Sequence, residues 1–286
     1  MSRVGSNPMR SRTIPNRPGV VISAIVHLPR LSDTYHHHRM EIVRLCLESM
    51  RKHVEEDADV LIWDNGSCEE MRRWLSEHYR PDHLILSKNI GKVSARTAIL
   101  RMFHPDTIIG ISDDDMLFYP GWLRPQKKLL GIYPNVGVVS GYPVVTQFRW
   151  GCSHTIEKAE KHPDINVTYG KFIEEEYDRD FCTSIGRDYG FQLRTTTNDI
   201  QAKALYKGRE AYLTGHHCQF ICYAGRILPF AVWDNHPMAD EKPFDGAIDN
   251  AGLMRLTTTK RYTRHMGNIP DEKIIREAQS FGLWKN

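Results

Sequence analysis

The sequence predicts an α/β protein in which a mostly parallel, Rossmann-like sheet is flanked by helices within a single domain. Short apolar, β-branched runs alternate with segments of helical spacing four times in the first 115 residues or so. The connections between them are short, as in parallel sheets built from right-handed crossovers. Turns rich in Asp, Asn and Gly follow the strands, so we expect them on one edge of the sheet, where open α/β folds bind ligands.

These repeats can be placed along the chain. Apolar runs typical of buried strands cover residues 20–26, 60–63, 84–86 and 107–112. Apolar side chains recur at helical spacing in residues 40–53, 68–79 and 93–103. The order of these segments predicts the topology of the first half of the fold.

Residues 142–226 do not continue this alternation, because helical and extended signals mix there. No linker-like Gly/Ser or Pro run precedes them, so we expect the variable half of the same domain. The later signals predict a strand at 219–224, a helix at 244–253, a strand end or loop at 262–267, and a helix at 271–281 after Pro270. One domain is therefore expected over residues 19–286, divided into 19–141, 142–268 and a C-terminal helix in 269–286.

Composition narrows the class of protein. The 41% of hydrophobic residues support a core, and a net charge of +3 is too small to indicate binding to nucleic acid or an anionic membrane. The six cysteines lack the paired spacing of a zinc site, so we expect free thiols in a reducing compartment. Residues 1–18 have no apolar core, and no run approaches the roughly 20 residues of a membrane helix. We therefore expect a cytoplasmic protein with a disordered leader.

Three adjacent carboxylates, Asp113, Asp114 and Asp115, follow the fourth apolar run. Adjacent aspartates repel one another and are poor strand formers, so they are expected where this strand leaves the sheet. Mg²⁺ and Mn²⁺ bind carboxylate oxygens and commonly share them with the phosphates of a substrate. The triplet predicts a metal–diphosphate site, with a solvated acidic turn as the alternative.

Two further turns are expected on the same edge. The sequence Asp64-Asn65-Gly66-Ser67 closes the second strand, where Gly supplies a positive φ and Asp64 is able to accept hydrogen bonds from a base or ribose. A plain turn is the alternative. Lys92 and Arg96 lie four residues apart on one helical face. They are expected to meet a diphosphate at the helix N-terminus, or else to form a solvated basic face.

Histidines and a second acidic group are the remaining candidates. His265 is a sensible additional metal ligand beside carboxylates. The adjacent histidines at 36–38 project in different directions and are expected not to be catalytic. A carboxylate among Asp240, Glu241 and Asp245 is placed to act as a general base toward an acceptor hydroxyl, or belongs to an acidic loop.

Together these motifs resemble the nucleotide-diphospho-sugar glycosyltransferases of the GT-A fold, in particular the large family-2 group. The resemblance covers residues 19–268 and is weakest between 145 and 225. It rests on five pieces in the right order: the turn at 64–67 after the opening strand, Asn89-Ile90-Gly91 with Ser94-Ala95-Arg96, Ser112–Asp115 with Tyr119–Leu123, Asp240-Glu241, and Arg264–Asn268. Asn65 stands where the family often has Asp, and Asp240-Glu241 reverses the family's Glu-Asp.

The resemblance implies a glycosyltransferase of the hexosyltransferase type, which moves a sugar from a UDP- or GDP-sugar to a hydroxyl-type acceptor. Residues 19–141 would bind the donor and 142–268 the acceptor. It places Asp64, Asn65, Lys92, Arg96, Asp113 and Asp114 at the donor, with Asp113 near the ribose. It also implies that Asp115, with Asp113 and His265, holds Mn²⁺ or Mg²⁺, and that Glu241, or failing it Asp240, deprotonates the acceptor if the reaction inverts configuration.

Two other classes share parts of this pattern. A sugar-1-phosphate nucleotidyltransferase has a similar half and metal-bound phosphates, but it usually opens with a Gly-rich loop, and residues 27–32 contain no Gly. A non-catalytic nucleotide-sugar-binding protein on a degenerate GT-A fold is disfavoured by the intact triplet and by His265.

Overall fold

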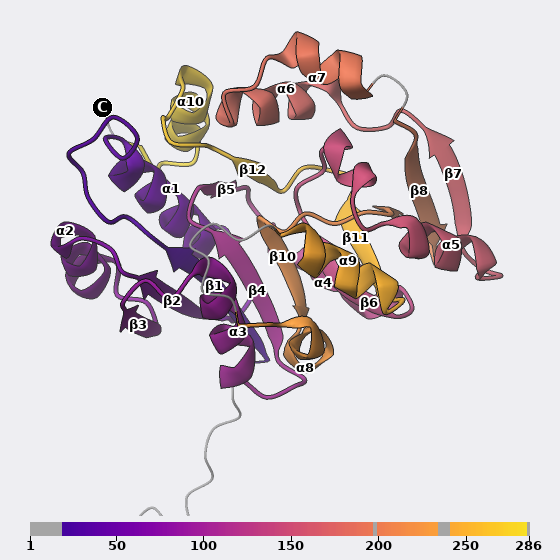
Figure 1. The fold of residues 1–286 in the computed structure, drawn as a ribbon, viewed down its shortest axis with the longest axis horizontal. Coiled ribbons are helices and arrows are strands. Elements are labelled where there is room, and N and C mark those ends of the chain that lie inside the picture. Colours follow the sequence, from indigo (N-terminus) through magenta and orange to yellow (C-terminus); the bar gives the residue numbers. More distant parts are fainter. Residues whose placement is uncertain (1–18, 197–198, 234–240, 285–286) are drawn as a thin grey trace, which may run out of the picture.

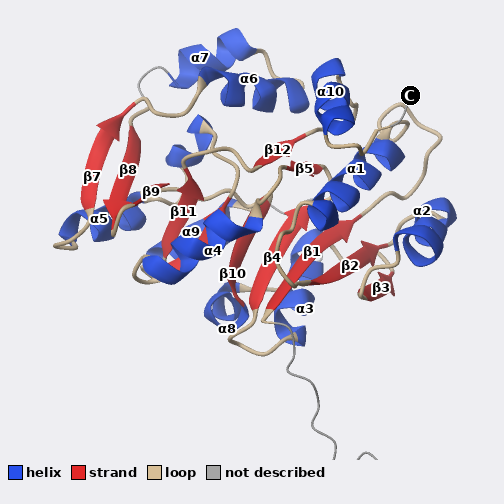
Figure 2. Cartoon of the chain, turned by 180° about the vertical axis from the view of Figure 1, so that it is seen from behind, coloured by secondary structure: helices blue, strands red, loops and turns tan. Residues whose placement is uncertain are grey.

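The structure, a computed structural model, describes residues 19–196, 199–233 and 241–284. In these residues helices pack on both faces of an extended sheet, which confirms the predicted α/β class (Figure 1, Figure 2). The predicted leader at 1–18 lies outside the described residues.

The described strands are β1 (Val20–Val26), β2 (Asp59–Asn65), β3 (His83–Ser87), β4 (Ile108–Asp113), β5 (Met116–Phe118), β6 (Val136–Ser140), β7 (Asn166–Gly170), β8 (Gln201–Tyr206), β9 (Arg209–Tyr212), β10 (Gln219–Tyr223), β11 (Met254–Thr258) and β12 (Thr263–His265). The α-helices are α1 (Arg39–Lys52), α2 (Glu69–Arg73), α3 (Lys92–Met102), α4 (Leu123–Ile132), α5 (Ser153–Lys161), α6 (Glu175–Ser184), α7 (Tyr189–Thr196), α8 (Ala224–Ile227), α9 (Lys242–Asn250) and α10 (Glu272–Ser280). Short turns of other helix types are the π-helical η1 (Trp74–Tyr79) and the 3₁₀-helical η2 (Val145–Arg149) and η3 (Leu228–Phe230).

Strand β1 lies inside the sheet and is buried on both faces, which explains its unbroken apolar run. Because side chains alternate along a strand, Ile22 and Ala24 join the core beneath α1, whereas Val21 and Ile25 join the core beneath α3. The sheet thus has two hydrophobic layers, one on each face.

The strand order in the described sheet is β3-β2-β1-β4-β10-β6-β11-β9-β8-β7, and β12 pairs with β5 in a separate small sheet. Strands β1 to β4 are parallel, as predicted, but β10 runs antiparallel to both β4 and β6. The second half of the sheet is therefore mixed. As a consequence, the start of β10 lies at the same edge as the end of β4.

The irregular middle of the chain supplies the far edge of the sheet and a cover over its end. Figure 1 shows α6, α7 and α10 beyond the edge where β4 ends, with β12 between them and the sheet. The acidic run at 174–180 forms most of α6 because two of its acids face inward. Asp178 accepts a hydrogen bond from the Val145 amide at 2.9 Å, and Asp180 lies 2.6 Å from Arg261 Nη1.

Candidate functional site

The Asp triplet lies at the end of β4, where the chain turns into β5. The carboxylates are largely withdrawn from solvent, with side chains of Asp113 and Asp115 only 18% and 17% exposed. Each has a cationic partner: Asp113 Oδ1 lies 2.6 Å from Lys92 Nζ, and Arg39 bridges Asp114 and Asp115. The carboxylates of a solvated acidic turn would be exposed and unpaired, so the burial and ion pairs of these three argue against that alternative.

Arg39 was not singled out in the sequence, although it begins α1 at the same edge. Its guanidinium is buried, contacts Asp114, and lies 3.2 Å from Asp115 Oδ2. Asp114 also accepts the His27 amide at 3.0 Å. Burial, followed by Asp115, raises the pKa of Asp114 above its ordinary value, although Arg39 opposes this. Arg39 thus holds two repelling carboxylates side by side.

Asp115 and His265 meet because their strands pair. In the small sheet, His265 lies opposite Met116, and the Met266 amide donates to the Asp115 carbonyl at 2.8 Å. His265 Nε2 is 3.4 Å from Asp115 Oδ2, while Nδ1 contacts Ser184 Oγ at 2.8 Å. Burial alone would raise the pKa of Asp115, but His265 and then Arg39 outweigh it and hold this pKa well below its usual range.

The predicted turn after β2 lies beside the turn that opens α3. Gly66 has φ of +89°, as the sequence predicted. The side chain of Asn65 joins the two turns: its amide donates to Asn89 Oδ1 at 3.2 Å, and its carbonyl oxygen accepts the Ile90 amide at 2.9 Å. Asp64 is fully buried and lies 3.0 Å from Arg72 Nε. In this structure both side chains shape the turns.

Lys92 and Arg96 project from α3 toward Glu241, the residue before α9. Arg96 Nη1 lies 2.5 Å from Glu241 Oε2, and Lys92 Nζ lies 3.4 Å from Oε1. The guanidinium of Arg96 also stacks 3.9 Å from the ring centre of Phe244. Burial opposes ionisation of Glu241, but Lys92 and Arg96 outweigh it and lower its pKa to about 2. The predicted alternative, Asp240, lies outside the described residues.

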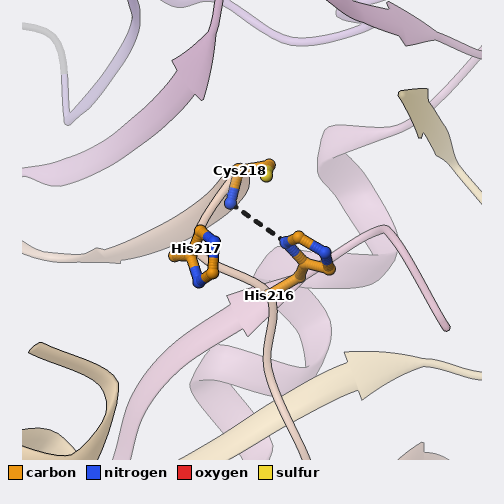
Figure 3. Close-up of side chains that lie close together, drawn as sticks. All are labelled: His216, His217 and Cys218. Atoms are coloured by element: carbon orange, nitrogen blue, oxygen red, sulfur yellow. Dashed lines mark hydrogen bonds between the residues drawn. The ribbon is translucent and has the colours of Figure 1, made fainter. Parts of the chain in front are cut away.

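The segment entering β10 brings a second polar group to this edge. Figure 3 shows His216, His217 and Cys218, where the Cys218 amide donates to His216 Nδ1 at 3.1 Å. His217 Nδ1 lies 3.0 Å from Asp245 Oδ2 of α9. The sequence predicts Asp245 as a possible base, but it does not predict a role for His217, because adjacent histidines carry no recognisable spacing signal.

Two cavities adjoin the site and share Ile185 and His265. One, of about 680 Å³, is lined by His217, Glu241 and Asp245 and by aromatic side chains that include Trp150. The other, of about 610 Å³, lies against Asp115. His265 therefore borders two cavities, each large enough to hold a ligand.

The residues present fit a divalent cation held by few protein ligands. A carboxylate and an imidazole suit Mn²⁺, and Asp115 Oδ1 is buried with no hydrogen-bond partner among the described residues. Asp113 instead contacts Lys92. Within the described chain, three potential ligand atoms come within 4.8 Å of one another at His216, His217 and Cys218, not at the predicted set. Ions of this kind often take one or two protein carboxylates and complete their shell with phosphates and water.

The sequence profile of glycosyl transferase family 2 matches residues 34–199, more than half of the chain. This chain belongs to glycosyl transferase family 2. The α/β fold with its mixed sheet is that expected of a GT-A member of the family. Membership supports the glycosyltransferase interpretation over a nucleotidyltransferase. The match includes the turn after β2, α3 and the Asp triplet, whereas Glu241 and His265 of this family 2 glycosyltransferase lie beyond it.

Other comparisons add less. A solved structure, the mannosyltransferase PcManGT from Pyrobaculum calidifontis in complex with GDP-Man and Mn²⁺, is similar at 22% identity and a TM-score of 0.34. The similarity covers 47% of this chain and 38% of that one, so the chain spans well under half of that enzyme. No curated protein matches significantly. Among the described helices of this family 2 glycosyltransferase, none is both long and apolar enough to cross a membrane.

Proposed function

We propose that this family 2 glycosyltransferase is a metal-dependent hexosyltransferase that moves a sugar from a UDP- or GDP-sugar to a hydroxyl group of an acceptor. The observation that carries the proposal is the Asp115–His265 pair, in which a buried carboxylate oxygen lacks a partner among the described residues. Residues 19–141 would bind the donor and 142–268 the acceptor, and the predicted C-terminal helix in 269–286 would follow them.

Asp115 and His265 would hold Mn²⁺ or Mg²⁺, with Asp113 as the predicted further ligand. When bound, such an ion neutralises the negative charge that develops on the leaving diphosphate. Asp64, Asn65 and Asp114 remain proposed donor-binding residues beside these groups.

Lys92 and Arg96 supply fixed positive charge at the donor. Burial opposes the charge on Lys92, but Asp113 and then Glu241 raise the pKa of Lys92, so it stays a cation at neutral pH. Its ammonium bridges Asp113 and Glu241, which lie on β4 and beside α9. A diphosphate bound there would lie beside the ammonium of Lys92. This fixed positive charge would stabilise the negative charge that develops on the leaving group.

The acceptor side is proposed to involve Glu241 and Asp240, the carboxylates implied by the family motif. A pKa of about 2 keeps Glu241 ionised at neutral pH, and its carboxylate contacts the cations of Lys92 and Arg96. It therefore fixes Lys92 and Arg96 in place, whichever group removes the acceptor proton.

Thermal shift with a panel of UDP- and GDP-sugars, with and without MnCl₂, tests the proposal. A donor at about 100 times its Kd should stabilise the native state by roughly 2.7 kcal/mol, and only with Mn²⁺. The variant Asp115→Ala should lose that stabilisation and its turnover while staying folded, because Arg39 keeps Asp114 as a partner. The matched control is Asp106→Ala, which removes a 91% exposed aspartate. Metal-dependent donor binding in Asp115→Ala equal to that of the parent would overturn the site.

A further inference from the structure

His217 and Asp245 form a hydrogen-bonded dyad in the wall of the 680 Å³ cavity. His217 lies in the segment between β9 and β10, and its side chain is 23% exposed, so a molecule in the cavity is able to reach it. Asp245 comes from α9 and is almost fully buried. The two elements are brought together by the fold and not by proximity in the sequence.

The carboxylate of Asp245 is held on both oxygens. Oδ2 lies 3.0 Å from His217 Nδ1, and Oδ1 lies 2.7 Å from Nη2 of Arg255, whose side chain is fully buried. Because an ionised carboxylate only accepts hydrogen bonds, the proton of neutral His217 must lie on Nδ1. The lone pair is then on Nε2. Asp245 therefore fixes both the tautomer and the orientation of the ring, as the aspartate carboxylate does in a nucleophile–His–Asp triad.

Among the residues that the structure describes, the other carboxylate and the other imidazoles that line the cavity are poorly suited to take a proton. Both oxygens of Glu241 contact cations, and a pKa of about 2 makes it a weak base at neutral pH. His216 is buried, its Nδ1 already accepts the Cys218 amide, and burial lowers its pKa well below the ordinary value. His265 faces Asp115. Of the described histidines that line the cavity, His217 is the one that a carboxylate orients and that a molecule in the cavity is able to reach.

We propose that His217, oriented by Asp245, is the general base that deprotonates the acceptor hydroxyl in an inverting transfer. This inference rests on the proposed function. Nε2 takes the hydroxyl proton as the acceptor oxygen bonds to the anomeric carbon. The bond from that carbon to the diphosphate oxygen breaks, and its electron pair leaves with the nucleoside diphosphate. Asp245 stabilises the imidazolium, which afterwards releases its proton to water.

The test compares the full-length parent with His217→Ala and His217→Gln. Neither change leaves Asp245 unpaired, because Arg255 remains bound to it. The matched control is His154→Ala, which breaks a similar pair, 3.3 Å between His154 and Asp249, outside the cavity. The readouts are binding of the stabilising UDP- or GDP-sugar with Mn²⁺ by calorimetry, and release of nucleoside diphosphate with water in place of the acceptor.

Both His217 variants are expected to bind the donor like the parent and to release nucleoside diphosphate roughly 10²–10⁴-fold more slowly. His154→Ala should behave like the parent, and added imidazole should raise the rate of His217→Ala. Release at the parental rate by the His217 variants, or a loss that imidazole does not restore, would overturn the role of His217 alone. A parent that binds and cleaves no nucleotide sugar would instead overturn the proposed function and this inference with it.

Discussion

Replacing Glu241 by Gln probes the buried ion pairs that connect α3 to the start of α9. The change keeps the shape of the side chain but removes its charge, so Arg96, which is 2% exposed, loses a counter-ion at 2.5 Å. Lys92 loses one of its two carboxylate partners. Because Arg96 cannot shed its proton, an uncompensated charge would remain in the protein interior.

The size of the effect follows from the structure in two ways. The folded state lowers the pKa of Glu241 from 4.5 to about 2, and at about 1.4 kcal/mol per pKa unit this is worth roughly 3 kcal/mol. Removing one partner of a buried ion pair typically costs roughly 3–5 kcal/mol. We therefore expect Glu241→Gln to lower the free energy of unfolding by roughly 3 kcal/mol, and Tm by roughly 6–12 °C at about 2–4 °C per kcal/mol.

The pH dependence gives the prediction its sign. Since the pKa of Glu241 is lower in the folded state, its stabilisation is complete above pH 4.5 and is lost as pH falls toward 2. The difference in unfolding free energy between parent and variant should therefore shrink over that interval. Urea unfolding at several pH values measures it, with Glu157→Gln, an exposed glutamate paired with Lys161, as the matched control. The control should change by less than about 1 kcal/mol. A Glu241→Gln variant as stable as that control, or a difference that does not change with pH, would refute the reasoning.

Two further predictions concern the metal pair and the turn after β2. His265→Ala should weaken Mn²⁺ and nucleoside-diphosphate binding together by roughly 10–100-fold, as measured by calorimetry, and parental affinities would show that His265 is not a ligand. Gly66→Ala should destabilise the fold by roughly 1–3 kcal/mol in urea, because φ is +89° and a Cβ would lie 2.7 Å from the Asn89 nitrogen. Gly131→Ala, in α4 with open space around it, should cost nothing, and equal effects at both glycines would contradict the argument.

Local pattern was sufficient for β1 to β4 and the helices between them, but it did not predict β5, α4 or β6. The strand predicted at 20–26 has those bounds, and the predicted positive φ at Gly66 is present. Apolar runs are informative there because β1, β2 and β4 are largely buried, whereas β3 at the edge of the sheet is only partly buried. The run at 219–224 also forms a strand, β10, but an apolar run carries no direction. Its antiparallel placement between β4 and β6 is set by pairing with strands far away in the sequence.

The residues of the candidate site divide in the same way, into those that a local sequence pattern predicts and those that it does not. Asp113, Asp115 and Lys92 were predicted because strand ends and helix starts mark the ligand-binding edge. Arg39 was missed, since an arginine after three histidines has no distinctive pattern, although its position at the start of α1 was a usable signal. His217 was missed for a stronger reason: its partner Asp245 is 28 residues away and is brought to it by α9. Such tertiary pairs are not encoded in any local spacing.

The small sheet of β5 and β12 also bears on when the proposed metal pair forms during synthesis of the chain. Asp115 and His265 are separated by 150 residues, and the backbone ladder that aligns them requires β12 to dock on β5. At about 5–20 residues per second, a ribosome needs roughly 8–30 s to add the intervening chain. Throughout that interval the parallel strands around β1 can pair, but the proposed metal pair of Asp115 and His265 is not yet formed. On the proposed assignment, a nascent chain that has not yet produced β12 would therefore carry the Asp triplet without the histidine that completes the metal pair.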